Sequence, residues 1–377
     1  MTDQPTNEGL ENVTVAETRR SYIDGDVGEL IIGGYPLEEL AEHATFEETV
    51  YLLWNDRLPD ADELTSFRAD LAAYRDLSPA TLDLLRAAAA DDADPMDALR
   101  MGVAAATIGH DTDGPEDEAC LLVAQLPTIV AAYWRLRNGD EPVAPDGDLS
   151  HAANYLYMLT GEQPTDAETR GLETYLNSVV DHGLNASTFS GRAIVSTETD
   201  LVSAVTGAVG ALKGPLHGGA PGPVLDMLLD IHESGDTEGY VEEKLDAGER
   251  IMGFGHRVYN VRDPRAAVLS SAAESFYESG GERDFFETAK TVETTTTDLL
   301  AERRPDLSLA TNVEFYTAVL LHGIGIPSEL FTTTFAIARV GGWTAHCLEQ
   351  LEDNRIIRPR SAYVGERDRT WVPVEER

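Results

Sequence analysis

The chain has 377 residues, and its 67 acidic against 28 basic side chains give a formal net charge of −39. This acidic excess argues against nucleic acid and an anionic membrane surface as partners, because both are bound through clustered Lys and Arg. Hydrophobic residues make up 42% of the chain and recur in periodic segments, so the sequence is that of a folded protein and not of a disordered one.

The charge also suggests the solvent for which the surface is built. Only three of the 28 basic residues are lysine. In molar salt the Debye length is about 3 Å, so neighbouring carboxylates scarcely repel one another, and strongly acidic surfaces are a known feature of halophilic proteins. We therefore expect a protein that requires high salt for folding and activity. The alternative is an acidic mesophilic protein that has no such requirement.

The N-terminal segment and the cysteines bear on location. Residues 1–17 are polar and acidic, unlike a signal or transit peptide. Cys120 and Cys347 are the only cysteines, which excludes a disulfide framework and a cysteine-based metal site. The longest apolar stretch, 121–134, contains a glutamine and a proline and is too short to cross a bilayer. We therefore expect a soluble, cytoplasmic protein in which 121–134 forms a buried helix.

Helix-start signals recur along the whole chain. Several segments begin with a capping residue followed by glutamate three positions on, or by proline at the first helical position: Thr45/Glu48, Ser78-Pro79, Asp94-Pro95 and Thr165/Glu168. From Pro223, apolar residues keep the i, i+3, i+4, i+7 spacing of an amphipathic helix. Period-two alternation is scarce, so we expect no sizeable sheet. The predicted fold class is all-α.

Two glycine-rich segments, 213–220 and 253–256, interrupt the helical pattern, and each contains a histidine. Glycine permits positive φ and a close approach of the backbone, so main-chain N–H groups in such loops can contact a ligand. Neither segment has the Gly-Lys-Ser/Thr ending of a phosphate-binding P-loop. On these grounds alone, a simple connection between helices is an equally good interpretation.

Two segments are locally basic in this acidic chain. Residues 253–266 carry three arginines against one aspartate, and residues 339–360 carry four arginines against three acidic residues. Arginine binds carboxylates and phosphates bidentately, so these segments indicate a small polyanionic ligand. The alternative is that the arginines pair with the surplus acidic residues.

The run Gly253-Phe-Gly-His256-Arg-Val-Tyr-Asn-Val-Arg-Asp-Pro-Arg265 resembles the signature of the citrate synthases. Other segments resemble that family in the expected order, and together they cover about residues 9 to 365: 22–25, 45–48, 181–188, 213–220, 312–316, 331–339 and 354–360. The resemblance implies a mostly helical homodimer with its active sites in a cleft between two domains. Residues 1–218 with 327–377 would form the large domain and 219–326 the small one, and the C-terminal part of one subunit would complete the partner's site.

The reaction implied is condensation of acetyl-CoA with oxaloacetate, followed by hydrolysis of the thioester to citrate and CoA. Removing a methyl proton beside a thioester needs a carboxylate base and a hydrogen-bond donor at the carbonyl oxygen. By resemblance, His217 is that donor, while His256 polarises the oxaloacetate ketone and protonates the alkoxide. The residues implied to hold the oxaloacetate carboxylates are His182, Arg265, Arg339 and Arg358 of the partner subunit.

The position of the base departs from the family pattern. The family has aspartate where this chain has Glu314, and the 25-residue spacing to Arg339 is the family's. Glutamate keeps the carboxylate but lengthens the side chain by one methylene, and a misplacement of that order can cost ~100-fold in rate if nothing compensates. Either the backbone is set back and Glu314 is the working base, or the chain is an impaired paralogue.

For the coenzyme, the resemblance suggests backbone contacts from Gly253, Phe254 and Gly255, with Arg257 and Arg262 at the phosphates. Surface ion pairing is the alternative role for both arginines. The implied chemistry uses acetyl-CoA as a co-substrate and needs neither a tightly bound cofactor nor a metal.

Three functions remain open from the sequence. The first is citrate synthase, and the second is a 2-methylcitrate synthase that uses propionyl-CoA. One methyl group in a pocket is worth only ~1–3 kcal/mol of discrimination, which the motifs do not reveal. The third is a catalytically silent homologue that binds CoA or a dicarboxylate.

Overall fold

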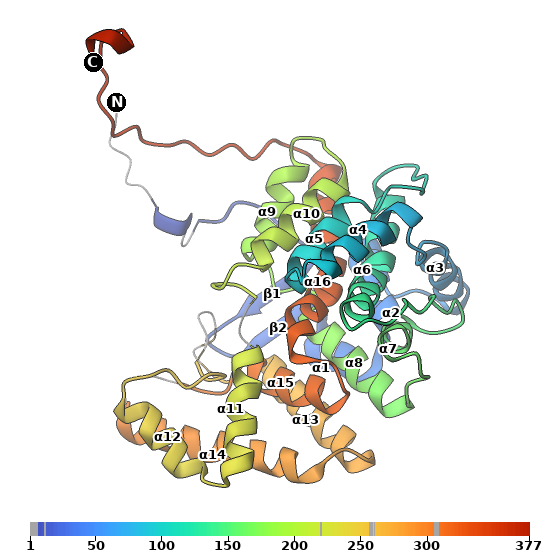
Figure 1. Cartoon of the computed structure of the whole chain (residues 1–377), viewed down its shortest axis with the longest axis vertical. Coiled ribbons are helices and arrows are strands. Elements are labelled where there is room, and N and C mark those ends of the chain that lie inside the picture. The colour runs from blue at the N-terminus through green and yellow to red at the C-terminus, as the bar shows by residue number, and fades with distance from the viewer. Residues whose placement is uncertain (1–6, 11–12, 219–220, 256–258, 260, 305–308) are drawn as a thin grey trace.

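The computed structural model describes residues 7–10, 13–218, 221–255, 259, 261–304 and 309–377. Within these residues the chain forms sixteen α-helices and one small sheet, which confirms the all-α prediction (Figure 1). In chain order the helices are α1 (Leu37–His43), α2 (Phe46–Asn55), α3 (Ala61–Ala73), α4 (Pro79–Ala90), α5 (Pro95–Ala104), α6 (Pro115–Arg137), α7 (His151–Thr160), α8 (Asp166–Val179), α9 (Ala186–Val195), α10 (Leu201–Leu212), α11 (Pro221–Ser234), α12 (Thr237–Asp246), α13 (Pro264–Ser279), α14 (Arg283–Arg303), α15 (Val313–Gly323) and α16 (Phe331–Glu352).

The sheet is a short antiparallel meander near the N-terminus. Its strands are β1 (Ser21–Asp24), β2 (Glu29–Ile32) and β3 (Tyr35–Pro36), paired in the order β1-β2-β3. Ser21 lies opposite Ile32, whose side chain is fully buried. The sheet adds β structure to one edge of a helical protein, and no sizeable sheet occurs in the described residues.

The helix starts follow the local capping signals. Thr45 with Glu48 and Thr165 with Glu168 form complete capping boxes at α2 and α8. The side chains of Ser78 and Asp94 accept backbone N–H bonds at the starts of α4 and α5, each ahead of a proline. Helix α11 begins at Pro221, two residues before the expected Pro223. Both prolines fall in its first turn, where backbone N–H groups have no partner within the helix, so the N–H that proline lacks is not missed.

Helix α6 is the central apolar helix. Among the described residues it is the one helix long and apolar enough to cross a membrane, but 78% of its most apolar window is buried inside the molecule. This confirms the expectation of a buried helix over 121–134. The helix carries Cys120, while Cys347 lies on α16, and both are free thiols.

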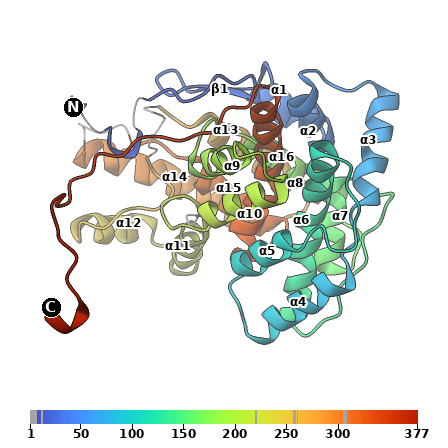
Figure 2. The same cartoon turned by 90° about the horizontal axis from the view of Figure 1, so that it is seen from above.

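The helices gather into two groups. Helices α11 to α15 lie together at one end of the molecule, and α2 to α10 with α16 occupy the other (Figures 1 and 2). Helix α16 packs against α2, α5, α6, α8, α9 and α10. Contacts of α13 and α15 with α8, and of α11 with α16, join the two groups, and α1 packs against both α8 and α13. Five of the functional residues expected from the sequence lie where these groups meet, namely His182, His217, Arg265, Glu314 and Arg339.

After α16 the chain leaves the helical body as an extended tail (Figures 1 and 2). Residues 358–372 are all exposed. Several large apolar side chains of the tail face solvent in the single chain, namely Ile356, Tyr363, Val364, Trp371 and Val374.

Candidate active site

A cavity of about 160 Å³ lies where the two helix groups meet. It brings together five residues expected from the sequence: His182, His217, Arg265, Glu314 and Arg339. They come from the α8–α9 loop, the loop after α10, and helices α13, α15 and α16. Segments far apart in the chain thus supply one site. The remaining lining residues are Tyr175, Val179, Asn185, Gly218, Pro221, Val313, Thr317 and Phe335.

His217 has one ring nitrogen fixed by Ser187 at the start of α9. The backbone N–H of Ser187 donates to His217 Nε2 at 3.3 Å, and Ser187 Oγ lies 2.8 Å from the same atom. Because a backbone N–H can only donate, Nε2 accepts and the neutral ring carries its proton on Nδ1. Burial, with a smaller effect from Arg339, lowers the pKa of His217 to about 4. At neutral pH His217 is therefore an uncharged imidazole that can donate through Nδ1.

The loop that carries His217 requires glycine at its next position. A Cβ on Gly218 would lie 2.4 Å from Leu212 O, closer than any side chain tolerates. Thr332 Oγ1 donates to the carbonyl oxygen of Gly218 at 2.9 Å. This close approach fixes His217 against the end of α10.

Glu314 lies in the first turn of α15, where the N-terminal end of a helix favours a carboxylate. The side chain of Asn312 accepts the Glu314 N–H at 3.0 Å and caps the helix. Burial raises the pKa of Glu314, and Arg265 partly offsets this effect. A carboxylate of raised pKa is a stronger base than one in water.

Two buried guanidinium groups give the cavity positive charge. Arg265 pairs with Asp263 through two contacts, Nε to Oδ1 at 3.0 Å and NH2 to Oδ2 at 2.8 Å. Arg339 on α16 donates from Nε to Val179 O at 2.7 Å. Burial lowers the pKa of Arg339 to about 10, so it stays protonated at neutral pH. Both guanidinium groups lie on the cavity wall, where they can bind an anionic ligand.

His182 lies in the loop between α8 and α9. Its Nε2 is 3.0 Å from the hydroxyl oxygen of Tyr259, a buried residue. Asn185 ends the loop by capping α9 through the Thr188 N–H. His182 is therefore held by its contact with Tyr259 on one side and by the capped start of α9 on the other.

The glycine loop reaches the same region through Asn312. Asn312 Nδ2 donates to Gly255 O, and the Asn312 N–H donates to Gly253 O, both at 3.0 Å. The Gly255 N–H donates to Ala310 O at 2.8 Å, so that N–H is not open to a coenzyme in this state. Phe254 packs edge-on against Phe315, with ring centroids 5.5 Å apart. Asn312 therefore links the 253–255 segment to the helix that carries Glu314.

Among the described residues, five that were expected from the sequence do not line this cavity: Gly253, Phe254, Gly255, Arg262 and Arg358. His256 and Arg257 lie outside the described residues. Arg262 is exposed and pairs with Glu293 at 3.0 Å, as the ion-pair alternative allowed. Arg358 lies exposed in the C-terminal tail and is not part of its own chain's cavity.

Sequence reasoning missed several supporting residues, among them Trp343. Its indole Nε1 donates to Ser187 Oγ at 3.0 Å, behind His217. The one indication in the sequence that Trp343 lies near the site is its position four residues after Arg339, on the same face of the helix. Asn312 and Tyr259 lie within motifs that resemble the family, but the motifs alone indicate no role for them.

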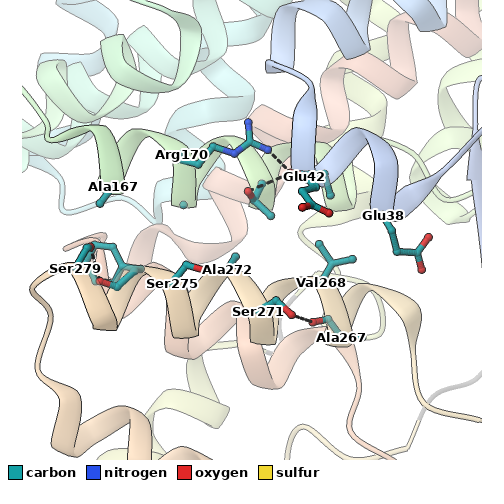
Figure 3. A pocket seen from close by; sticks show the side chains of 14 residues that line it. Glu38, Glu42, Ala167, Arg170, Ala267, Val268, Ser271, Ala272, Ser275 and Ser279 are labelled. Atoms are coloured by element: carbon teal, nitrogen blue, oxygen red, sulfur yellow. Dashed lines mark hydrogen bonds between the residues drawn. The ribbon is translucent and has the colours of Figure 1, made fainter.

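A second and larger cavity, of about 610 Å³, lies between α1, α8 and α13. Figure 3 shows small side chains on α13, such as Ser271 and Ser275, facing α1 and α8. Arg170 on its wall donates to the carbonyl oxygens of Ala41 and Ala44. None of the described residues that line this cavity is a histidine. The smaller cavity, where histidines, a carboxylate and two arginines converge, is therefore the candidate active site.

Comparison with known proteins agrees with this geometry. Residues 9–360 match the family model described as "Citrate synthase, C-terminal domain". The chain belongs to the citrate synthase family. The citrate synthase of Haloferax volcanii is 46% identical to it over 98% of both chains.

Two further relatives of this citrate synthase family member bear on structure and specificity. The citrate synthase of Thermoplasma acidophilum, solved in a ternary complex with carboxymethyl coenzyme A and oxaloacetate, superposes with a TM-score of 0.88. It is 30% identical, over 99% of this chain and 100% of that one. The 2-methylcitrate synthase 1 of Corynebacterium glutamicum is 36% identical over the full length of both chains. The resemblance inferred from the motifs is thus confirmed for the family and the fold.

Proposed function

We propose that the chain condenses acetyl-CoA with oxaloacetate and hydrolyses the thioester to give citrate and CoA. The observation that carries this proposal is the meeting of His217, Glu314, Arg265 and Arg339 around one small cavity. It pairs a base and a neutral hydrogen-bond donor with two groups that bind carboxylates, as the reaction requires.

In the first step, Glu314 removes a proton from the acetyl methyl group. His217 donates from Nδ1 to the thioester oxygen as negative charge develops there. A neutral imidazole suits this role because its proton is better matched to an enolate than that of an imidazolium. The low pKa of His217 and the raised pKa of Glu314 both support this division of roles.

In the second step, the enol carbon attacks the ketone of oxaloacetate. Arg265, Arg339 and His182 hold the carboxylates, and His256 polarises the ketone and protonates the alkoxide. The support for the first three is their place on the cavity wall. Hydrolysis of the resulting thioester then releases CoA, and no metal or bound cofactor takes part.

The proposed assembly is a homodimer in which Arg358 of the partner subunit completes each site. The exposed apolar side chains of the tail support a partner surface for this segment. Residues 219–326 form the small domain in this proposal, in line with the grouping of α11 to α15. The proposed coenzyme contacts are still Gly253, Phe254, Gly255, Arg257 and Arg262. Because the Gly255 N–H is bonded to Ala310 O, Gly255 would contact the coenzyme through other atoms.

The proposed setting is a salt-rich cytoplasm. The net charge of −39 and the 46% identity to the Haloferax volcanii enzyme support it. The alternative substrate is propionyl-CoA, favoured by the 36% identity to a 2-methylcitrate synthase.

One assay separates these functions. The purified protein, in concentrated potassium chloride, is given oxaloacetate with acetyl-CoA or with propionyl-CoA, and release of the CoA thiol is followed. We expect faster release from acetyl-CoA. Faster release from propionyl-CoA would select the 2-methylcitrate reaction, and no release from either would overturn both activities in favour of a silent homologue.

A further inference from the structure

One face of α16 supports three parts of the proposed site. Arg339 lines the cavity, Trp343 donates to Ser187 behind His217, and His346 faces Asp181. The spacings of four and three residues place these side chains on one side of the helix. Helix α16 also packs directly against α8 and α9, whose connecting loop carries His182.

His346 and Asp181 form a fully buried pair. His346 Nε2 lies 3.2 Å from Asp181 Oδ1, and both side chains are fully shielded from solvent. Arg192 NH1 lies 3.1 Å from His346 Nδ1. A guanidinium group can only donate, so Nδ1 accepts and the neutral ring carries its proton on Nε2, which faces Asp181. Neither facing atom makes a hydrogen bond of good geometry to any described residue, so the 3.2 Å contact between them is electrostatic and not a well-aligned hydrogen bond.

Asp181 is joined to both sides of His182 in the chain. Its second oxygen, Oδ2, accepts a hydrogen bond from Ser21 Oγ on β1. The same Ser21 oxygen accepts the N–H of Gly183 at 2.9 Å. Ser21 therefore connects the residue before His182 to the residue after it.

The carboxylate of Asp181 also acts on Arg339. Burial works against ionisation of Asp181, but His346, Ser21 and Arg339 together hold the pKa of this carboxyl below its usual range. In return, Asp181 partly offsets the effect of burial on the guanidinium of Arg339. A buried anion at this point thus stabilises a buried cation on the cavity wall.

We infer that Asp181 and His346 are positioning residues for oxaloacetate: they hold the His182 loop and the charge of Arg339 in place without touching substrate. This inference rests on the proposed function. The pair lies behind two of the groups proposed to hold the substrate carboxylates, and Arg192 and Ser21 fix it from either side. The alternative is a buried pair that contributes only to stability.

The test measures binding of oxaloacetate alone, by calorimetry, together with the melting temperature of each variant in the same potassium chloride buffer. Asp181→Asn keeps the shape and removes the charge, and His346→Leu removes both ring nitrogens. We expect each to weaken oxaloacetate binding by about 10-fold or more, the size of one lost hydrogen bond to a charged group. His346→Gln, which can both donate and accept, should recover most of the affinity.

The matched control is His151→Leu. His151 is also buried, at 2% exposure, but lies on α7 and does not line the cavity. We expect it to lower the melting temperature and leave oxaloacetate affinity unchanged. The double variant of Asp181→Asn and His346→Leu should bind about as weakly as either single variant, since both changes break one unit.

Two results would overturn the inference. One is an oxaloacetate affinity in folded Asp181→Asn equal to wild type. The other is an affinity loss in His346→Leu no greater than that of the His151→Leu control at equal loss of melting temperature. Failure of the wild-type protein to bind oxaloacetate would instead overturn the proposed function, and this inference with it.

Discussion

Glu314 is the residue on which the proposed chemistry depends most. Replacing it with glutamine removes the base and keeps the shape, so we expect kcat to fall by about 100-fold to 10,000-fold. The Asn312 cap fixes the first turn of α15, which carries Glu314, and burial raises the pKa of its carboxyl group. Both features support its role as the base. Turnover is measured by CoA thiol release at saturating substrates.

The companion changes are Glu314→Asp and Glu173→Gln. If the backbone is set for glutamate, the shorter aspartate should lose ~100-fold in rate; a gain would instead support an impaired paralogue. Glu173 is another buried glutamate, on α8 and outside the candidate active site, so its glutamine variant should keep full turnover. Full turnover in Glu314→Gln would eliminate Glu314 as the base.

Glu173 carries a pH prediction of its own. Burial, and then the nearby Glu47, raise its pKa to about 7 from an ordinary 4.5. The folded state therefore holds this proton more tightly than the unfolded state, and its contribution to stability falls as pH rises from about 4.5 through 7. Glu173→Gln should be more stable than wild type at pH 8, by about 1–3 kcal/mol, with the difference vanishing near pH 4.5.

The measurement is the melting temperature of both proteins across pH 4.5 to 8.5 at constant potassium chloride. Glu173 contacts Arg170 at 3.4 Å, and loss of that ion pair works against the gain. A variant less stable than wild type at pH 8 would show that this ion pair outweighs the cost of burying the charge.

Among the elements, α16 makes a very close backbone approach to a neighbouring segment. A Cβ on Gly342 would lie 2.4 Å from Val180 O and 2.8 Å from Asp181 Oδ1. Gly342→Ala should therefore push α16 away from the 180–182 segment, lowering both the melting temperature and oxaloacetate affinity. Gly210→Ala, in α10, meets only the Arg100 side chain at 3.9 Å and should be neutral or stabilising by up to ~1 kcal/mol. Equal melting temperatures for the two variants would contradict the packing argument.

The elements also show what the sequence could predict. Capping boxes such as Thr165 with Glu168 join residues only three positions apart. The helix starts could therefore be predicted from the local sequence alone. The motifs, through the family resemblance, identified five residues that meet in the cavity. Contacts such as Trp343 to Ser187 and Asn312 to Gly255 join segments 156 and 57 residues apart. They depend on how helices pack, which local sequence does not determine.

At the scale of the whole molecule, the net charge of −39 predicts a dependence on salt. Dilution into low salt lengthens the Debye length from about 3 Å at 1 M to about 30 Å at 0.01 M, so the acidic surface repels itself. We expect ellipticity and turnover to fall together on dialysis into dilute buffer. Unchanged values in both would identify a protein that is acidic without requiring salt.

The exposed tail predicts complementation between two inactive variants. His217→Ala lacks the proposed donor, and Arg358→Ala lacks the residue proposed to act in the partner's site. Each variant alone should be nearly inactive. Dimers reassembled from an equal mixture should recover about one quarter of wild-type activity, because half are mixed and each mixed dimer has one complete site. No recovery, with mixed dimers verified by mass spectrometry, would contradict shared sites.

The two free cysteines have a practical consequence. Burial raises the pKa of both Cys120 and Cys347 to about 12, so at pH 8 only about 0.01% of either is thiolate. A maleimide dye should therefore leave the native protein unlabelled. A single cysteine introduced by Tyr363→Cys would then be the one reactive position, and fluorescence energy transfer between two such dyes would report directly how far apart the tails of two subunits lie.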